Sequence, residues 1–243
     1  MSSLSGLPVI YGIDPKSTET VPQHQLGSLG FTADGRKFRY TNAAGTAIAV
    51  GKLCIAVDIT TNHEDLAVNT ASVGDRTLDI TLGGTAVAAG EYEEGFVIVT
   101  DGTAEGEVYA IKAAPAQSSG SGTFTPTLEE PIRVAFEAAT TVTLVRNKYR
   151  DVIISNGTQA DLPVGVTPTA VGADDFFWAQ TGGWACILVD TSDTVVGQPI
   201  TIGDNDNGAV TTHNAATEVL VGMQPAGVGA DAGEHGAFWL TLD

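Results

Sequence analysis

Two segments of this chain have residue types and spacing that could bind a phosphate or a cation. The first, residues 45–53, superficially fits a phosphate-binding loop, in which glycine backbone amides and a lysine hold the phosphates. Five residues instead of four separate Gly45 from Gly51, however, and Leu53 stands where a Ser or Thr hydroxyl must hold magnesium. We therefore predict no nucleotide site there.

The second segment, residues 203–208, is rich in Asp and Asn and resembles a calcium loop. If Gly208 is aligned with the invariant glycine of an EF-hand loop, Gly203 occupies the first ligand position and Asn214 replaces the bidentate Glu. A polar turn is therefore the preferred interpretation. The four histidines show no metal-ligand spacing, and we expect them in surface loops. They are His24, His63, His213 and His235. The sequence thus predicts neither a metal site nor a cofactor.

Catalytic patterns are equally weak. No Gly-x-Ser-x-Gly elbow occurs, and the paired acids Glu93-Glu94 and Asp174-Asp175 are adjacent in sequence. Adjacent strand residues point to opposite faces, so solvated turns explain these pairs better than an acid/base pair does. We predict that the protein is not an enzyme.

Three tryptophans offer a different chemistry, because indole faces can stack on the apolar sides of sugar rings. The preferred interpretation is that Trp178 and Trp239 are equivalent core residues of a repeated unit. Trp184, which follows Gly182-Gly183, is the tryptophan that we expect to be exposed.

The charge balance argues against nucleic acid as a partner. The chain has 29 acidic and 11 basic residues and a formal charge of -18, so phosphates would meet a repulsive field. We also expect no secretory signal and no membrane helix. All bases lie in residues 1–150, and six of them form two groups, Arg36, Lys37 and Arg39, and Arg146, Lys148 and Arg150. Two interpretations stay open. Either the excess of acidic residues only keeps the protein soluble, or the two basic groups also dock the first part of the chain on an acidic neighbour.

Short strands and tight turns dominate the chain. Residues 1–25 contain three prolines, and no strand-like or helix-like hydrophobic period continues there for more than a few residues, which predicts an extended arm. Asp34-Gly35 suits a type I′ hairpin turn, after which Phe38 and Tyr40 share one face. A second hairpin is expected around residues 101–106. The Gly/Ser-rich residues 115–122 form either a domain linker or a long hairpin loop, and Cys54 and Cys186 are expected to be buried free thiols.

Two repeats support an all-β fold. Gly-Thr-Ala phrases occur at residues 45–51 and 84–90, and residues 164–174 are echoed by residues 221–231, each copy leading to a Phe-Trp pair. We predict an extended N-terminal arm (1–25), a first β domain (26–150) and an acidic C-terminal β domain (151–243). The β regions are expected to be barrels or sandwiches, with internal duplication in the C-terminal part.

Several of these segments together resemble capsid decoration (cement) proteins of tailed bacteriophages, particularly those of marine phages. They are residues 26–53, residues 130–135 with 142–147, and the element from Phe177 to Thr181 with Gly183. The resemblance implies a β-rich protein, made in the cytoplasm of the bacterial host, on the outer surface of the virion. It further implies homotrimers that bridge subunits of the major capsid protein and have no catalytic residues.

An interface would be the functional surface of such a protein. An extended segment can add a strand to a neighbouring sheet, so Val9, Ile10 and Tyr11 are interface candidates, together with the six clustered bases. The alternative is a carbohydrate- or host-surface-binding module displayed on a head or fibre, for which an exposed Trp184 would be the evidence.

Overall fold

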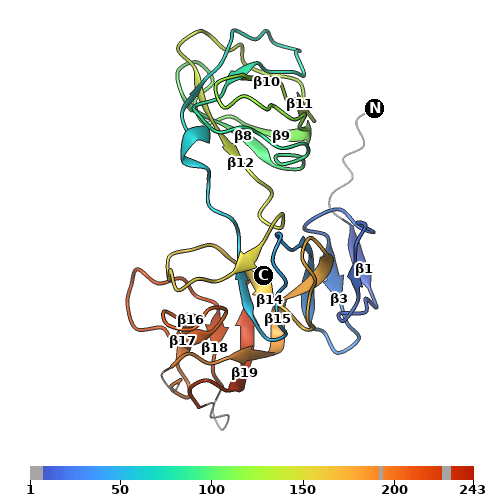
Figure 1. Ribbon diagram of the computed structural model, residues 1–243, viewed down its shortest axis with the longest axis vertical. Coiled ribbons are helices and arrows are strands. Elements are labelled where there is room, and N and C mark those ends of the chain that lie inside the picture. Colours follow the sequence, from blue (N-terminus) through green and yellow to red (C-terminus); the bar gives the residue numbers. More distant parts are fainter. Residues whose placement is uncertain (1–7, 192–193, 226–230) are drawn as a thin grey trace. The chain divides into compact units, whose positions relative to one another are not determined.

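The computed structural model describes residues 8–191, 194–225 and 231–243 (Figure 1). In this part of the chain the regular structure consists of β-strands, most of them short, and one 3-10 turn, η1 (Thr61–His63), so the fold is all-β as predicted. None of the described helical segments is long and apolar enough to cross a membrane. The chain divides into a discontinuous unit, Met1–Val57 with Lys148–Asp243, and an inserted unit, Asp58–Asn147.

A mixed sheet of twelve strands builds the discontinuous unit. Its main path runs β1-β3-β4-β15-β19-β18-β16-β17, and the other four strands pair with members of this path or with one another. The strands are β1 (Val9–Tyr11), β2 (Thr18–Glu19), β3 (Leu29–Phe31), β4 (Lys37–Asn42), β5 (Leu53–Ile55), β13 (Ile153–Ile154), β14 (Pro163–Val166), β15 (Phe176–Leu188), β16 (Pro199–Ile202), β17 (Val210–Thr212), β18 (Gly222–Met223) and β19 (His235–Thr241).

The thirteen-residue strand β15 organises this sheet. Its first half pairs antiparallel with β4, from Phe176↔Asn42 to Gly182↔Lys37. Its second half pairs antiparallel with β19, from Gly182↔Thr241 to Leu188↔His235. One strand therefore joins N-terminal and C-terminal segments of the chain, which Figure 1 shows in blue and red within one unit.

Aromatic packing surrounds the first half of β15. Trp178 is 2% exposed and lies with Phe38 and Tyr40 in one cluster, whereas Phe177, its neighbour, packs into a second cluster on the other face. Phe38 and Tyr40 share one face, as predicted, and both are buried. Burial on both faces makes this half of β15 part of the core.

The inserted unit contains a five-stranded sheet that curls into a half-barrel, in the order β11-β9-β8-β12-β6, and a small pair, β10-β7. Its core contains Tyr92, Tyr109, Phe124 and Phe136. The strands are β6 (Leu66–Ala67), β7 (Ile80–Thr81), β8 (Phe96–Asp101), β9 (Val108–Ala113), β10 (Thr123–Phe124), β11 (Thr127–Leu128) and β12 (Thr141–Val145). The predicted hairpin around residues 101–106 is present between β8 and β9.

The two units differ from the predicted division into residues 26–150 and 151–243. The reason is pairing between distant segments. Strand β5 pairs with β13, Ile55 opposite Ile153, and also with β14, so residues on both sides of the inserted unit share one sheet. The Gly/Ser-rich residues 115–122 lie inside the inserted unit, where Gln117 bridges to Val87, and are not a linker between units.

Two short segments of the predicted N-terminal arm pair into this sheet. Strand β1 pairs parallel with β3, and β2 pairs antiparallel with Phe176 and Phe177 of β15. Residues 1–7 of the predicted arm lie outside the described residues. Three prolines therefore did not prevent pairing, because the two strands formed between them are only two and three residues long.

The hairpin between β3 and β4 is confirmed, but its turn is not type I′. That type needs positive φ at both central residues, whereas Gly35 has φ 83° and Asp34 does not share this conformation. The Gly35 amide donates to the Thr32 carbonyl at 3.0 Å, and the Thr32 amide donates to the Arg36 carbonyl at 3.2 Å. These bonds define a three-residue loop that ends in a left-handed glycine.

Both Gly-Thr-Ala phrases form the same local structure. Ile48 and Val87 each make an isolated β-bridge, and each is followed by a turn that ends in a left-handed glycine, Gly51 (φ 70°) or Gly90 (φ 75°). The longer repeat is comparable where it is described. In the first copy β14 pairs antiparallel with β15, and in the second β18 pairs antiparallel with β19, while residues 226–230 of the second copy are outside the described residues.

Candidate functional site

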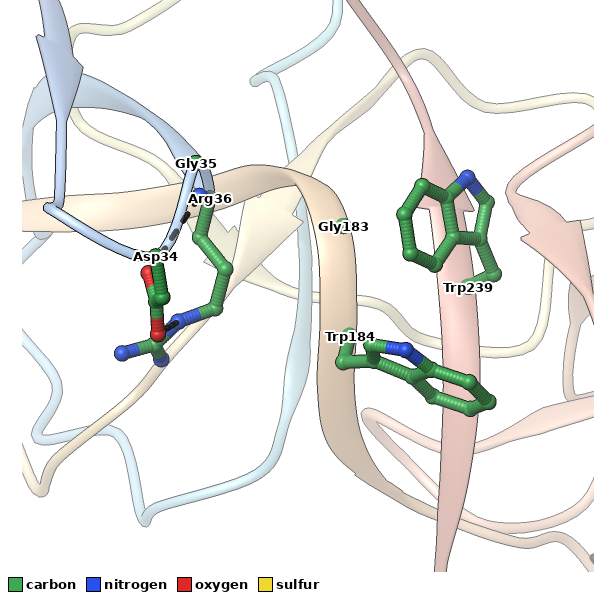
Figure 2. A pocket seen from close by; sticks show the side chains of 6 residues that line it. All are labelled: Asp34, Gly35, Arg36, Gly183, Trp184 and Trp239. Atoms are coloured by element: carbon green, nitrogen blue, oxygen red, sulfur yellow. Dashed lines mark hydrogen bonds and ion pairs between the residues drawn. The ribbon is translucent and has the colours of Figure 1, made fainter.

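Two exposed tryptophans lie side by side on the sheet of the discontinuous unit. Trp184 on β15 and Trp239 on β19 are directly opposite in the strand register, and their side chains are 48% and 42% exposed. Their ring centroids are 5.8 Å apart and the ring planes meet at 87° (Figure 2). We call this pair the tryptophan corner.

Strand alternation explains why Trp239 faces outward. Phe238 and Leu240 are buried on one face of β19, so the side chain between them must point to the opposite face. The predicted exposure of Trp184 is confirmed, whereas the predicted burial of Trp239 is wrong. Trp178, in the first copy of the repeat, is buried because β15 is covered on both faces at that point.

A glycine-containing bulge sets the position of Trp184. The register between β15 and β4 shifts between Gln180 and Gly182, and Gly183 has φ 83°. The buried side-chain amide of Gln180 donates to the carbonyls of Gly182 and Trp184, the latter at 2.7 Å. A fixed bulge therefore supports one wall of the tryptophan corner.

The β3–β4 turn supplies charged groups beside the tryptophans. The Arg36 Nε donates to Asp34 Oδ2 at 2.8 Å, and the Thr32 hydroxyl donates to the other oxygen of the same carboxylate. The bond from Thr32, followed by those from Arg36, holds the pKa of Asp34 below its ordinary value despite opposing desolvation. The turn and the corner border a hollow of about 320 Å³ that is open to solvent on one side and is lined by Asp34, Gly35, Arg36, Gly183, Trp184 and Trp239 (Figure 2).

A second hollow, of about 360 Å³, adjoins the first through shared side chains. Arg36 and Trp184 line both hollows, and the second also has Lys16, Thr167 and Cys186 in its wall. The sequence indicated Trp184 and Arg36 as separate candidates. Their common position beside Trp239 was not predicted.

The predicted strand-addition residues lie on β1. Val9 and Tyr11 are 49% and 78% exposed, whereas Ile10 packs against the aromatic cluster that contains Trp178. Strand β1 ends the main path of the sheet, and among the described residues only β3 pairs with it. One side of β1 is therefore a sheet edge.

The first predicted basic group is paired with acids of its own unit. Arg36 binds Asp34, while Arg39 Nε lies 2.8 Å from Asp243 Oδ2 and Lys37 Nζ donates to the Asp243 main-chain oxygen. Burial opposes ionisation of Asp243, but the hydrogen bonds from Arg39 and Thr181 and the charges of Arg39 and Lys148 together outweigh it and lower the pKa of that carboxyl. These charges are therefore partly neutralised within the unit.

The second basic group is divided between the two units. Arg146 is in the inserted unit and forms an ion pair with Glu91, whereas Lys148 and Arg150 belong to the discontinuous unit. Lys148 Nζ lies 5.6 Å from the centroid of the Tyr149 ring. Burial lowers the pKa of Lys148. The three bases do not act as a single patch of one compact unit.

The Asp/Asn-rich loop of residues 203–208 surrounds a buried carboxylate. Asp190 accepts hydrogen bonds from the backbone amides of Asp204, Asn205 and Asp206, at 2.8 to 3.2 Å. The loop thus directs N–H donors inward, where a cation would require oxygen ligands. Among the described residues, no three or more His, Cys, Asp or Glu side chains form a group that could hold a metal ion.

Two of the four histidines are not in surface loops as predicted, since His235 is exposed but begins strand β19 and His63 is buried. His63 in the inserted unit is fully buried, with Nδ1 against the Tyr92 hydroxyl and Nε2 against the Thr85 carbonyl at 2.9 Å. Because a carbonyl only accepts, Nε2 carries the proton and Nδ1 accepts from Tyr92. His63 is therefore a structural cross-link within this unit.

We expect His63→Ala to lower the free energy of unfolding of the inserted unit by about 1–3 kcal/mol, because the buried Tyr92 hydroxyl and the partly buried Thr85 carbonyl lose their hydrogen bonds. Hydrogen exchange of the β8 and β12 amides measures this loss. The control is His213→Ala, a partly exposed histidine of the discontinuous unit. Unchanged protection of β8 and β12 would contradict the cross-link.

The two cysteines are free but differ in burial. Cys54 is buried as predicted, and this burial raises its pKa to about 12. Cys186 is exposed, which corrects the prediction, because it lies on the same face of β15 as Trp184.

Comparisons with protein-family models, with curated proteins and with solved structures found no match to this chain.

Proposed function

We infer that this chain is a non-enzymatic structural protein of a virus particle that binds the outer surface of a tailed-phage capsid. In this proposal it stabilises the shell by bridging major capsid subunits, and it assembles as a homotrimer. The proposal rests on the resemblance of residues 26–53, 130–135, 142–147 and 177–183 to decoration proteins. The all-β architecture is consistent with that resemblance. We also infer that the C-terminal part is an internal duplication, with β15 and β19 as its equivalent long strands.

The observation that carries the attachment mechanism is the edge of β1. The Pro8 carbonyl accepts from the Leu29 amide, and the Gly12 amide donates to the Phe31 carbonyl. Backbone groups alternate in direction along a strand, so Val9 and Tyr11 direct their N–H and C=O groups away from β3. Together with the exposed side chains of these residues, this edge could accept a strand of a capsid subunit.

Shell stabilisation then follows from differential binding. A protein that binds the assembled shell more tightly than the dissociated subunits raises shell stability by mass action. Many symmetry-related copies multiply the effect, because each bound copy links neighbouring subunits. No chemical step is required of the chain.

We expect Val9→Pro to weaken binding to particles that lack the protein by about tenfold or more, because it removes an outward N–H donor that strand addition would use. The matched control is Val9→Thr, which keeps the donor and a β-branched side chain. Quantitative sedimentation with purified particles measures both. Equal binding by the two variants would contradict attachment through this edge.

The location itself is tested by imaging. Electron cryomicroscopy of particles that carry the protein should show its density at threefold or quasi-threefold positions of the head. Density only at a tail or a vertex would refute the capsid proposal, whichever segment makes the contact. The oligomeric state of the purified chain, measured by light scattering, tests the proposed trimer separately.

A further inference from the structure

We propose that the tryptophan corner and the two hollows beside it bind a linear oligosaccharide, with sugar rings stacked on Trp184 and Trp239. This inference does not depend on the proposed attachment to a capsid, because the site lies within one compact unit of the isolated chain. It rests on three observations: the right-angled rings of Trp184 and Trp239, the ion pair of Asp34 and Arg36 in the β3–β4 turn, and the two hollows that share Trp184 and Arg36.

The aromatic geometry suits a sugar ring. One face of a pyranose carries C–H groups, which pack on the electron-rich face of an indole. The rings of Trp184 and Trp239 meet at 87° and both are about half exposed, so they offer two walls at a right angle. Single exposed apolar side chains are common, but two adjacent exposed tryptophans form a contiguous apolar patch of the kind that marks a binding site.

The polar groups beside the corner favour a sugar over an apolar peptide side chain. The Asp34 carboxylate retains acceptor capacity beyond its bonds from Thr32 and Arg36, and the Arg36 guanidinium has five N–H donors. Hydroxyl groups of a sugar both donate and accept, so they can use both residues. Because the bond from Thr32 and the ion pair already hold the carboxylate, little ordering is needed on binding.

Two adjoining hollows point to more than one sugar unit. Their volumes of about 320 and 360 Å³ are similar, and Trp184 and Arg36 line both. Each is at the lower end of the range of about 300–1,000 Å³ that is typical of small-ligand sites. Lys16 supplies a further donor in the second hollow. A chain of sugars crossing Trp184 would fill one hollow after the other.

The partner class is therefore a glycan and not a broad protein surface. Met223 extends the exposed apolar row beyond Trp239, opposite it in the register, but it lines neither hollow. Asp34 lines the first hollow and Lys16 the second, and Asp and Lys are both depleted in protein interfaces.

The experiment titrates the isolated protein with cellohexaose, laminarihexaose, chitohexaose and hexamannuronate. Calorimetry and tryptophan fluorescence follow binding, and fluorescence reports the site because Trp184 and Trp239 are exposed whereas Trp178 is buried. We expect at least one hexamer to bind with a dissociation constant below about 1 mM. Trp184→Ala should weaken that binding by about tenfold or more, and Arg36→Gln should also weaken it.

The matched control is Phe96→Ala, which removes an exposed aromatic side chain in the inserted unit. It should leave sugar affinity unchanged, and circular dichroism confirms that each variant is folded. Binding of none of the four hexamers, or equal binding by wild type and Trp184→Ala, would overturn the inference. If Trp184→Ala instead abolishes attachment to particles and no hexamer binds, the corner is a protein contact. These outcomes leave the β1-edge test unaffected, so the two proposals can fail separately.

Discussion

Trp178→Ala is expected to lower the free energy of unfolding of the discontinuous unit by about 3–5 kcal/mol, the range for removing a large buried aromatic side chain. Trp178 is 2% exposed and its ring lies 5.1 Å from that of Tyr40 and 5.3 Å from that of His24, centroid to centroid. A Cβ atom on Gly30 would lie only 2.7 Å from the Trp178 ring, so the chain packs closely against it. Little room exists for neighbours to collapse into the cavity.

Trp239→Ala is the matched control, because Trp239 occupies the corresponding position of the second repeat copy. Its side chain is 42% exposed and therefore loses less buried apolar area, so we expect a clearly smaller loss than for Trp178→Ala. Urea denaturation followed by tryptophan fluorescence measures both variants. All three tryptophans belong to the discontinuous unit, so this signal does not report unfolding of the inserted unit. Similar losses in the two variants would mean that both copies bury their tryptophan.

Local patterns in the sequence predicted local structure well. The glycine of Asp34-Gly35 supplies the left-handed residue of a hairpin turn, and the alternation after it places Phe38 and Tyr40 on one buried face. The exact turn type was wrong because Asp34-Gly35 also fits a three-residue loop with glycine last. The two hydrogen bonds of Thr32 that distinguish these loops are set by the strand register and not by the dipeptide.

Pairing between distant segments was not predictable in this way. No local property of β5 indicates that its partners follow the whole inserted unit, and residues 115–122 have a linker-like composition without connecting two units. Likewise, the parallel pairing of β1 with β3 depends on a register that no turn residue specifies. The unit boundaries near residues 57 and 147 carry no Gly/Ser signal.

In the candidate site, too, local features were predictable from the sequence and contacts between distant segments were not. Glycine before Trp184 indicated its exposure, and the alternation of Phe238, Trp239 and Leu240 contained the signal that Trp239 faces outward. The repeat obscured this signal, because it equated Trp239 with Trp178, whose strand is buried on both faces. The approach of Arg36 to Trp184 depends on β4 and β15 lying side by side, which the spacing along the chain does not encode.

Asp190→Asn is expected to destabilise the discontinuous unit by about 2–3 kcal/mol at neutral pH, because a buried carboxylate that accepts several N–H bonds is replaced by a neutral amide. Asp190 Oδ2 accepts from the amides of Asp204 at 2.9 Å and Asn205 at 3.2 Å, and Oδ1 accepts from Asp206 at 2.8 Å. An amide side chain has only one oxygen for these donors. Urea denaturation measures the loss, and Asp206→Asn is the control, since the loop uses the backbone amide of that residue.

The pH dependence of the stability difference between wild type and Asp190→Asn shows whether the variant loses stability through the missing charge or through altered packing. Burial disfavours the ionised form of Asp190, but the N–H donors of Thr191, Asp206 and Asn205, together with a hydrogen bond from the Asp204 carboxyl, outweigh it and lower its pKa to about 2. The same bond to Asp190 raises the pKa of Asp204. A carboxyl whose folded pKa is below its unfolded value of about 3.9 contributes stability above that value and loses it as pH falls through the folded pKa. The difference in the free energy of unfolding between wild type and Asp190→Asn should therefore be largest near neutral pH and should decrease between about pH 4 and pH 2. A gap that stays constant down to pH 2 would show that packing, and not the charge, is what Asp190 contributes to the loop.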